Sequence, residues 1–335
     1  MTTTRYSEKL ARLRAGMGRK GDYMIADAKD ADVTGGVPAT GPRRDANGNI
    51  VGARTRPEFL DQIRKVIDQD VVDIMLTSAG NMDVLATSGA FDGRAIQPAF
   101  RANETTCVWA NVRHAGYAQT PSRPYRGANL AFAPADLCLY SLTFNNDTEA
   151  DARALEAYAA FRRETRAAGV AHFLEVFNPN VPGAVGEAEV GAYVTDCIIR
   201  LMSSLTSTER PEFLKVAYNG PKAMEELAVH DPSMVVGVLG GAGATHRDTF
   251  ELIAQSERYG ARLALFGRKI NQAEDQCRLI QWMRVVADGE VSPEEAVKGY
   301  HGDLETLGLR PDRPLADDIQ ITADVLRFDA AALSV

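Results

Sequence analysis

The 335-residue sequence has no apolar stretch close to the roughly 18 residues that a membrane-spanning helix needs. Its N-terminal segment is basic but lacks the apolar core of a secretory signal. No long basic run is present, and the net charge is -8, which disfavours nucleic acid as a partner. We therefore expect a cytoplasmic protein whose partners are neither membranes nor nucleic acids.

Cysteine and histidine are scarce. The cysteines are scattered and form no Cys-x-x-Cys pair, which indicates reduced thiols and neither a disulfide framework nor a zinc site; they are Cys107, Cys138, Cys197 and Cys277. The five histidines show none of the close spacings of metal-binding motifs. The sequence therefore predicts no metal site.

The chain does contain short apolar runs that alternate with longer amphipathic segments. Eight of these runs predict strands, at residues 22–27, 71–77, 105–112, 137–144, 172–177, around Lys215, 234–239 and 263–266. Because helix or a long connection follows each run, we expect an α/β fold, the (β/α)8 TIM barrel. A doubly wound open sheet is the alternative, but its glycine-rich loop would follow the first strand and not the seventh.

We expect one TIM-barrel domain over residues 1–335. It would comprise an N-terminal helix at 5–18, the barrel at about 22–288 and a helical extension at 289–335. A polar insert at 31–57 is too long for an ordinary connection between a strand and a helix. It is either a lid or binding loop, or a surface excursion without a role.

Lys215 is the one charged residue of a short apolar run that ends at residues 219–221, Asn-Gly-Pro. A buried ammonium is costly unless it is paired or neutralised. A lysine with a lowered pKa is the usual nucleophile for Schiff-base formation with a carbonyl. The alternative is a lysine that reaches water or pairs with a carboxylate.

Polar residues at the carboxyl ends of the barrel strands would share one rim with Lys215, because that end of a TIM barrel carries the active site. They are Asp27, Lys29, Ser78, Asn111, Thr143, Glu175, Lys215, Tyr218, Gly241 and Arg268. Asp27 and Glu175 would flank Lys215, tune its pKa and relay protons. Glu175 could equally be the partner that keeps Lys215 inert.

Two glycine-containing loops predict a phosphate site. Gly240 and Gly241 follow the seventh strand, and Gly267 and Arg268 follow the eighth. Backbone N–H groups in such loops bind anions, arginine adds a bidentate cation, and phosphate sites recur after these two strands of the fold. Alternatively, the glycines serve tight turns.

Three segments carry a resemblance to a known family: 214–216 (Leu-Lys-Val), 239–242 (Leu-Gly-Gly-Ala) and 266–272 (Phe-Gly-Arg-Lys-Ile-Asn-Gln). With them the chain resembles the class I aldolase superfamily over about 22–288. The nearest branch contains archaeal-type fructose-bisphosphate, tagatose-bisphosphate and deoxyribose-phosphate aldolases and the autoinducer-2 thiolase.

The resemblance implies that Lys215 forms an imine with a phosphorylated ketose or ketone, that Asp27 is the strand-one aspartate, and that no cofactor is needed. It also implies a homo-oligomer. The family's strand-one histidine is replaced by Ala28, and its strand-four tyrosine has no match unless Tyr140 serves. Asp27, Glu175 and Tyr218 are therefore our candidates for proton transfer.

The arginines of the long insert suggest a second anion site at Arg44 and Arg54, with Arg43 and Arg56 nearby, or else are solvated loop charges. We expect an aldehyde-lyase acting reversibly on a C–C bond. The alternatives are imine-dependent acyl transfer, as in the thiolase branch, and a barrel that binds a phosphosugar without catalysis. A metal-dependent hydrolase is a more distant alternative.

Overall fold

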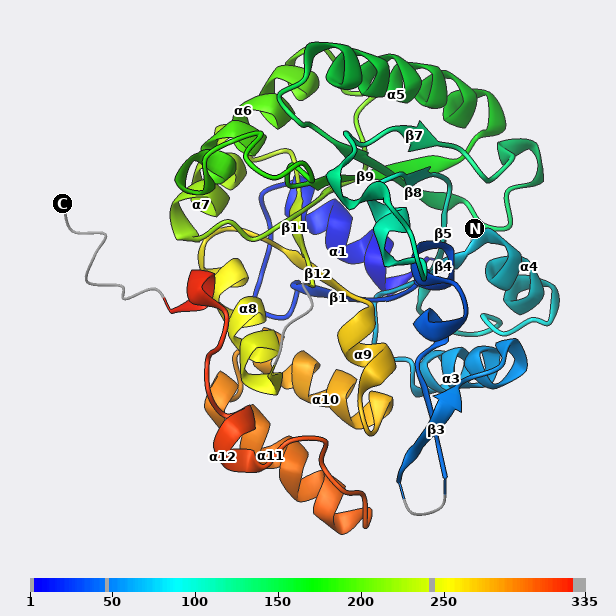
Figure 1. The fold of residues 1–335 in the computed structure, drawn as a ribbon, viewed down its shortest axis with the longest axis vertical. Coiled ribbons are helices and arrows are strands. Elements are labelled where there is room, and N and C mark those ends of the chain that lie inside the picture. The colour runs from blue at the N-terminus through cyan, green and yellow to red at the C-terminus, as the bar shows by residue number, and fades with distance from the viewer. Residues whose placement is uncertain (1–2, 46–47, 241–244, 328–335) are drawn as a thin grey trace.

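The structure is a computed structural model that describes residues 3–45, 48–240 and 245–327. Within these residues, eight parallel strands close into a barrel in the order β1-β12-β11-β10-β9-β8-β5-β4 (Figure 1). The predicted TIM barrel is confirmed. Its strands are β1 (Met24–Lys29), β4 (Ile74–Ser78), β5 (Gln97–Arg101), β8 (Leu137–Thr143), β9 (Ala171–Phe177), β10 (Leu214–Val216), β11 (Val236–Leu239) and β12 (Leu263–Phe266).

The third barrel strand was predicted in the wrong place. The predicted range 105–112 holds the end of the short β6 (Glu104–Thr105) and the 3-10 helix η2 (Val108–Asn111), whereas the barrel strand is β5. β5 has the sequence Gln-Pro-Ala-Phe-Arg, and its proline and polar ends hide its strand character. Its remaining residues, Ala99 and Phe100, are fully buried on opposite faces of the barrel wall.

Helices surround the barrel. They are α3 (Arg56–Gln69), α4 (Ala79–Thr87), α5 (Thr148–Ala168), α6 (Val190–Ser203), α7 (Pro221–His230), α8 (His246–Arg258), α9 (Arg268–Gln272) and α10 (Gln276–Ala287), followed by α11 (Pro293–Thr306), α12 (Leu315–Asp318) and η6 (Asp324–Leu326). Capping residues set the bounds of α5, because Asp147 caps its first turn and the left-handed Gly169 ends it. Among the described residues, no helix combines the length and apolar character of a membrane span.

The alternation of side chains along each strand produces two apolar layers. Leu214 and Val216 belong to the layer between the strands and the outer helices, whereas Leu139 and Leu265 belong to the layer inside the barrel. A side chain between two outward residues, such as Lys215, therefore points inward.

Helix α1 (Arg5–Arg14) covers the amino ends of the strands. Tyr6 and Leu10 pack against the inner layer, and Lys9 pairs with Asp73 at 2.9 Å just before β4. In Figure 1 this helix lies behind the centre of the barrel. The apolar interior is thus sealed at the end opposite the carboxyl ends of the strands.

The long insert after β1 folds into α2 (Asp32–Gly35), the 3-10 helix η1 (Val37–Thr40) and a hairpin of β2 (Pro42–Arg44) and β3 (Ile50–Ala53). The hairpin projects away from the barrel near α3 (Figure 1). A second insert contains β6, η2, η3 (Tyr117–Gln119), β7 (Pro124–Tyr125) and η4 (Leu130–Phe132) between β5 and β8.

Candidate active site

Lys215 lies inside the barrel on β10 and is 5% exposed. The register places it beside Glu175 of β9, and its Nζ lies 2.5 Å from Glu175 Oε1. The structure therefore brings these two predicted residues together as a buried ion pair. A buried ion pair needs further hydrogen-bond partners to offset the loss of hydration of its two charges.

Arg101 supplies those partners. From the end of β5 its guanidinium donates to Asp30 Oδ2 at 2.5 Å, to Glu175 Oε2 at 3.2 Å and to Ser141 Oγ at 2.9 Å. The Ser141 hydroxyl in turn donates to Glu175 Oε2 at 2.6 Å. We call Asp30, Arg101, Ser141, Glu175 and Lys215 the charged network.

The sequence analysis missed Arg101, Asp30 and Ser141. Arg101 was missed because β5 was misplaced, although the alternation of Ala99, Phe100 and Arg101 is a usable signal. Asp30 lies one residue beyond β1, where no strand pattern remains. Ser141 is an ordinary small residue in an apolar strand, and only the register with Glu175 reveals its position.

The charges of the network set its protonation. Burial alone would raise the pKa of Glu175, but Lys215 and Arg101 outweigh it and lower that pKa below its usual value. Burial likewise opposes ionisation of Asp30, and the charges of Arg101 and Lys215 still lower its pKa. The two carboxylates of the charged network are thus held in their ionised form beside Arg101 and Lys215.

A cavity of about 410 Å³ opens above the network. This volume is within the usual range for small-molecule sites. Its polar lining comprises Asp30, Arg101, Glu175 and Lys215 at the base, with Thr34, Cys107, Asn111, Asn178, Asn180 and Arg268 from the surrounding loops. The predicted rim residue Asn111 thus reaches the cavity from η2 and not from a strand.

Asp27 is not at this cavity, which corrects the prediction. Residues 24, 26 and 28 point into the barrel, so Asp27 and Lys29 face the helices, where Lys29 Nζ lies 3.4 Å from Asp27 Oδ2 and donates to Gln276 at 2.7 Å. Burial raises the pKa of Asp27 to about 6, although Lys29 opposes the shift. The carboxylate that β1 delivers to the cavity is Asp30.

Tyr218 is likewise on the helix side of the wall. It lies two residues past β10 with the outward parity of Leu214 and Val216, and its hydroxyl donates to Gln255 Oε1 of α8 at 3.1 Å. The Tyr218 side chain therefore points from the strand toward α8, and it does not line the cavity that contains Lys215. The prediction of a proton-relay role for Tyr218 is therefore corrected.

The predicted phosphate residues Gly240, Gly267 and Arg268 all line the cavity, and Gly241 lies outside the described residues. A Cβ at Gly240 would lie 2.2 Å from the Phe266 ring, and one at Gly267 would lie 2.6 Å from the Ala28 carbonyl oxygen. The two glycines are thus required for close packing of the strand ends. Arg268 has an exposed side chain.

Arg44 and Arg54 line a separate cavity of about 390 Å³ beside the hairpin. Arg44 donates to Asp312 at 2.7 Å, and Arg54 donates to the backbone oxygen of Asn271 at 2.9 Å. Both guanidinium groups thus hold the hairpin against neighbouring segments. Their role in binding a second anion stays a prediction.

The comparisons with known proteins find similarity in structure alone. No protein-family model matches the chain, and no curated protein sequence matches it. A solved archaeal fructose 1,6-bisphosphate aldolase is 17% identical, with a TM-score of 0.59, 85% of this chain and 99% of that chain covered. A Schiff base forming fructose-1,6-bisphosphate aldolase is 18% identical, with a TM-score of 0.57 and coverages of 84% and 98%.

The fructose-bisphosphate aldolase of Slackia heliotrinireducens is 14% identical, with a TM-score of 0.62 and coverages of 89% and 90%. The chain shares the fold of these aldolases. At such low identity the likeness is one of fold alone, and a shared fold does not fix the activity.

Proposed function

We propose that the protein is a class I aldolase, a carbon–carbon lyase in which Lys215 forms a Schiff base with a phosphorylated ketose or ketone. The observation that carries this proposal is the buried Lys215 amine at the base of a cavity, 2.5 Å from Glu175. An isolated structural ion pair has no need for an open cavity above its amine. The proposal requires neither a metal nor an organic cofactor.

The first steps need a neutral amine and an acid. Glu175 accepts a proton from Lys215, and the freed amine attacks the substrate carbonyl to form a carbinolamine. Arg101 keeps the pKa of Glu175 low, so the protonated Glu175 is a strong acid for the departing hydroxyl. Water leaves, and a protonated imine joins Lys215 to the substrate.

Cleavage uses the imine as the electron sink. A base takes the proton of the hydroxyl two carbons from the imine carbon, the C–C bond breaks, and its electron pair passes into an enamine while an aldehyde leaves. Asp30 is the candidate base, because it is ionised, lines the cavity and is held by Arg101. Protonation of the enamine and hydrolysis of the imine then return Lys215, and no oxidant or reductant is consumed.

The phosphate of the substrate would bind at the glycine-lined wall of the cavity. Arg268 offers the cation there, and Gly240 and Gly267 allow close approach of the backbone. Gly241 is proposed as part of the same wall from the sequence pattern. The carbonyl end of a substrate bound there would extend toward Lys215, which lines the same cavity.

Borohydride reduction tests the proposal. The protein is incubated with dihydroxyacetone phosphate and other small phosphorylated ketones, reduced, and weighed by intact mass spectrometry. We expect a stable adduct that Lys215→Met abolishes and that Lys222→Met, an exposed lysine on α7, retains. Failure of every ketone to give an adduct would favour the non-catalytic phosphosugar barrel. An adduct whose turnover requires coenzyme A would favour acyl transfer.

A further inference from the structure

A second cluster of polar side chains lies outside the barrel, where α8, α11 and α12 meet. His246 begins α8, His301 is in α11 and Asp318 ends α12. Asp318 Oδ2 lies 2.5 Å from His246 Nδ1 and 2.9 Å from His301 Nε2. Two imidazole nitrogens thus converge on one carboxylate oxygen of Asp318, whose side chain is 1% exposed.

The protons on His246 do not match this geometry. Its other nitrogen, Nε2, faces Glu274 Oε2 at 3.8 Å and has no hydrogen-bond partner among the described residues. A neutral imidazole carries one N–H, so it can donate on one side only. With a carboxylate on each side, the remaining nitrogen directs its lone pair at an anion.

A second proton on the ring would remove this conflict at the cost of a buried charge. A cation that replaces the proton between His246 Nδ1 and Asp318 removes the conflict without that cost, with the two atoms moving apart from their 2.5 Å separation. The single ring proton is then free to sit on Nε2 and face Glu274.

We propose that His246 Nδ1, His301 Nε2 and Asp318 bind a divalent transition metal ion of the zinc class. The three ligand atoms all lie within 4.8 Å of one another, so small movements would bring each of them to about 2.0–2.2 Å from a common ion. Two imidazoles and one carboxylate suit zinc and its neighbours in the first row more than calcium or magnesium.

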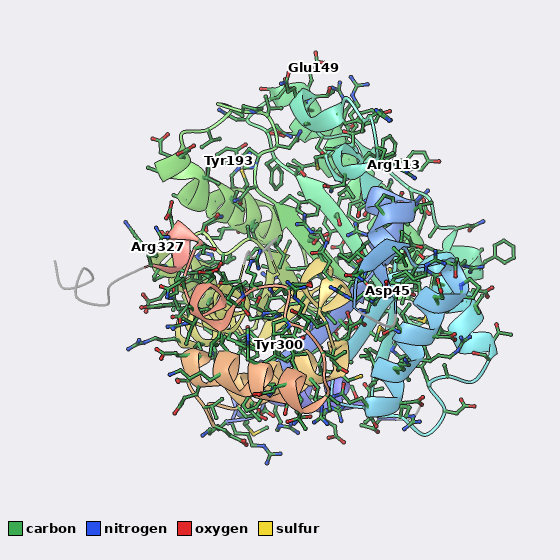
Figure 2. The ribbon with its side chains drawn as sticks, turned by 60° about the horizontal axis from the view of Figure 1, so that its bottom comes forward. Asp45, Arg113, Glu149, Tyr193, Tyr300 and Arg327 are labelled. Atoms are coloured by element: carbon green, nitrogen blue, oxygen red, sulfur yellow. The ribbon has the colours of Figure 1, made fainter. Side chains whose placement is uncertain are left out.

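Glu274 and Tyr300 complete the surroundings. Glu274 Oε2 faces His246 Nε2 at 3.8 Å, longer than a hydrogen bond, on the side where a carboxylate usually stands behind a ligating histidine. Tyr300 of α11, labelled in Figure 2, packs its ring 4.6 Å from that of His246 and donates its hydroxyl to Glu274 at 3.1 Å. Both contacts fix the orientation of the imidazole.

The ion would serve as a structural clasp for the C-terminal segment. Asp318 also accepts from the His246 backbone N–H at 2.8 Å, and Thr322 donates to Asp248 two residues further along α8. The three proposed ligands do not line the cavity that contains Lys215. The proposal therefore stands independently of the aldolase chemistry.

Metal binding by the full-length, untagged protein tests this site. The protein is stripped with chelator, titrated with zinc or cobalt, freed of excess ion, and its metal content is measured by mass spectrometry. We expect one ion per chain, a cobalt absorption spectrum of a low-coordinate N/O site, and a rise in melting temperature with zinc.

His301→Gln and Asp318→Asn should each weaken binding by about 100-fold or more, and Glu274→Gln by about 10–100-fold, because it only orients His246. His230→Ala removes an exposed histidine on α7 and should bind like the wild type. A wild-type protein that retains no ion would overturn the proposal. So would undiminished binding by His301→Gln, whose folding is checked by circular dichroism.

Discussion

At the scale of single residues, Arg101 organises the site. Its guanidinium contacts Asp30, Ser141 and Glu175 at once, and lysine cannot reproduce that planar set of donors. We predict that Arg101→Lys lowers kcat/KM by about 100-fold, the usual effect of a misplaced catalytic group. It should also move the acidic limb of the pH–rate profile upward, because the pKa of Glu175 rises.

The control for this variant is Arg64→Lys, which changes an exposed pair with Asp61. Steady-state kinetics across pH provide the measurement. A role in packing alone would reduce activity without displacing the pH profile, and that result would remove Arg101 from the proposed proton chemistry.

Asp27 predicts a specific pH dependence of stability. The pKa of Asp27 is about 6 in the folded protein, above its value in the unfolded chain. The stabilising contribution of Asp27 to the free energy of unfolding is therefore fully present below the unfolded pKa, and it is lost as the pH rises through 6. Asp27→Asn removes this titration. Between pH 5 and pH 8 the wild type should lose about 1 kcal/mol of unfolding free energy relative to Asp27→Asn. Urea unfolding measures the difference, and an equal gap at both pH values would contradict it.

Arg268 is expected to act on substrate binding. Hydrogen bonds from a charged donor contribute about 1.5–3 kcal/mol, so Arg268→Met should raise KM for a phosphorylated substrate by about 10–100-fold. KM for the unphosphorylated analogue should stay constant. The comparison of the two substrates is the measurement, and equal losses for both would show that Arg268 does not contact the phosphate.

At the scale of elements, the packing of the strand ends explains two of the glycines. Gly267→Ala places a Cβ 2.6 Å from the Ala28 carbonyl oxygen, so we predict a loss of about 1–3 kcal/mol in unfolding free energy. Gly302→Ala is the matched control, because its Cβ meets open space on α11, and it should gain about 0.5–1 kcal/mol. Urea unfolding of both variants measures this, and similar effects from the two would contradict the packing argument.

Some elements can be predicted from local sequence patterns, and others cannot. Strands such as β9 and the helix α5 follow from apolar periodicity and capping residues, which are local properties. β5 does not, because Pro98 and the polar residues at both ends of this strand are typical of a loop. Its place in the sheet is fixed by pairing with the neighbouring strands β4 and β8. Asp27 was misassigned for a related reason: the strand was recognised, but which face points inward depends on the closed barrel.

The cluster of His246, His301 and Asp318 lay beyond sequence reasoning altogether. Its members are far apart in the chain, and local spacing rules for metal motifs cannot detect ligands that only the packing of three helices brings together. Lys215 was found because a lone charge in an apolar run is visible in the sequence itself.

At the scale of the whole molecule, the packing that closes the barrel and the candidate active site lie at opposite ends of the strands. α1 seals the amino ends of the strands with Tyr6 and Leu10, and the charged network and its cavity lie toward the carboxyl ends. This arrangement is usual for TIM-barrel enzymes. The expected homo-oligomer stays a prediction that sedimentation velocity can check.

The central claim is that Lys215 is the nucleophile. Its most direct test is peptide mapping of the protein after borohydride reduction with dihydroxyacetone phosphate. Lys269 is a suitable rival, because burial lowers its pKa to about 8. We predict that the reduced adduct maps to Lys215 alone. An adduct on Lys269 or any other lysine, with Lys215 unmodified, would contradict the account.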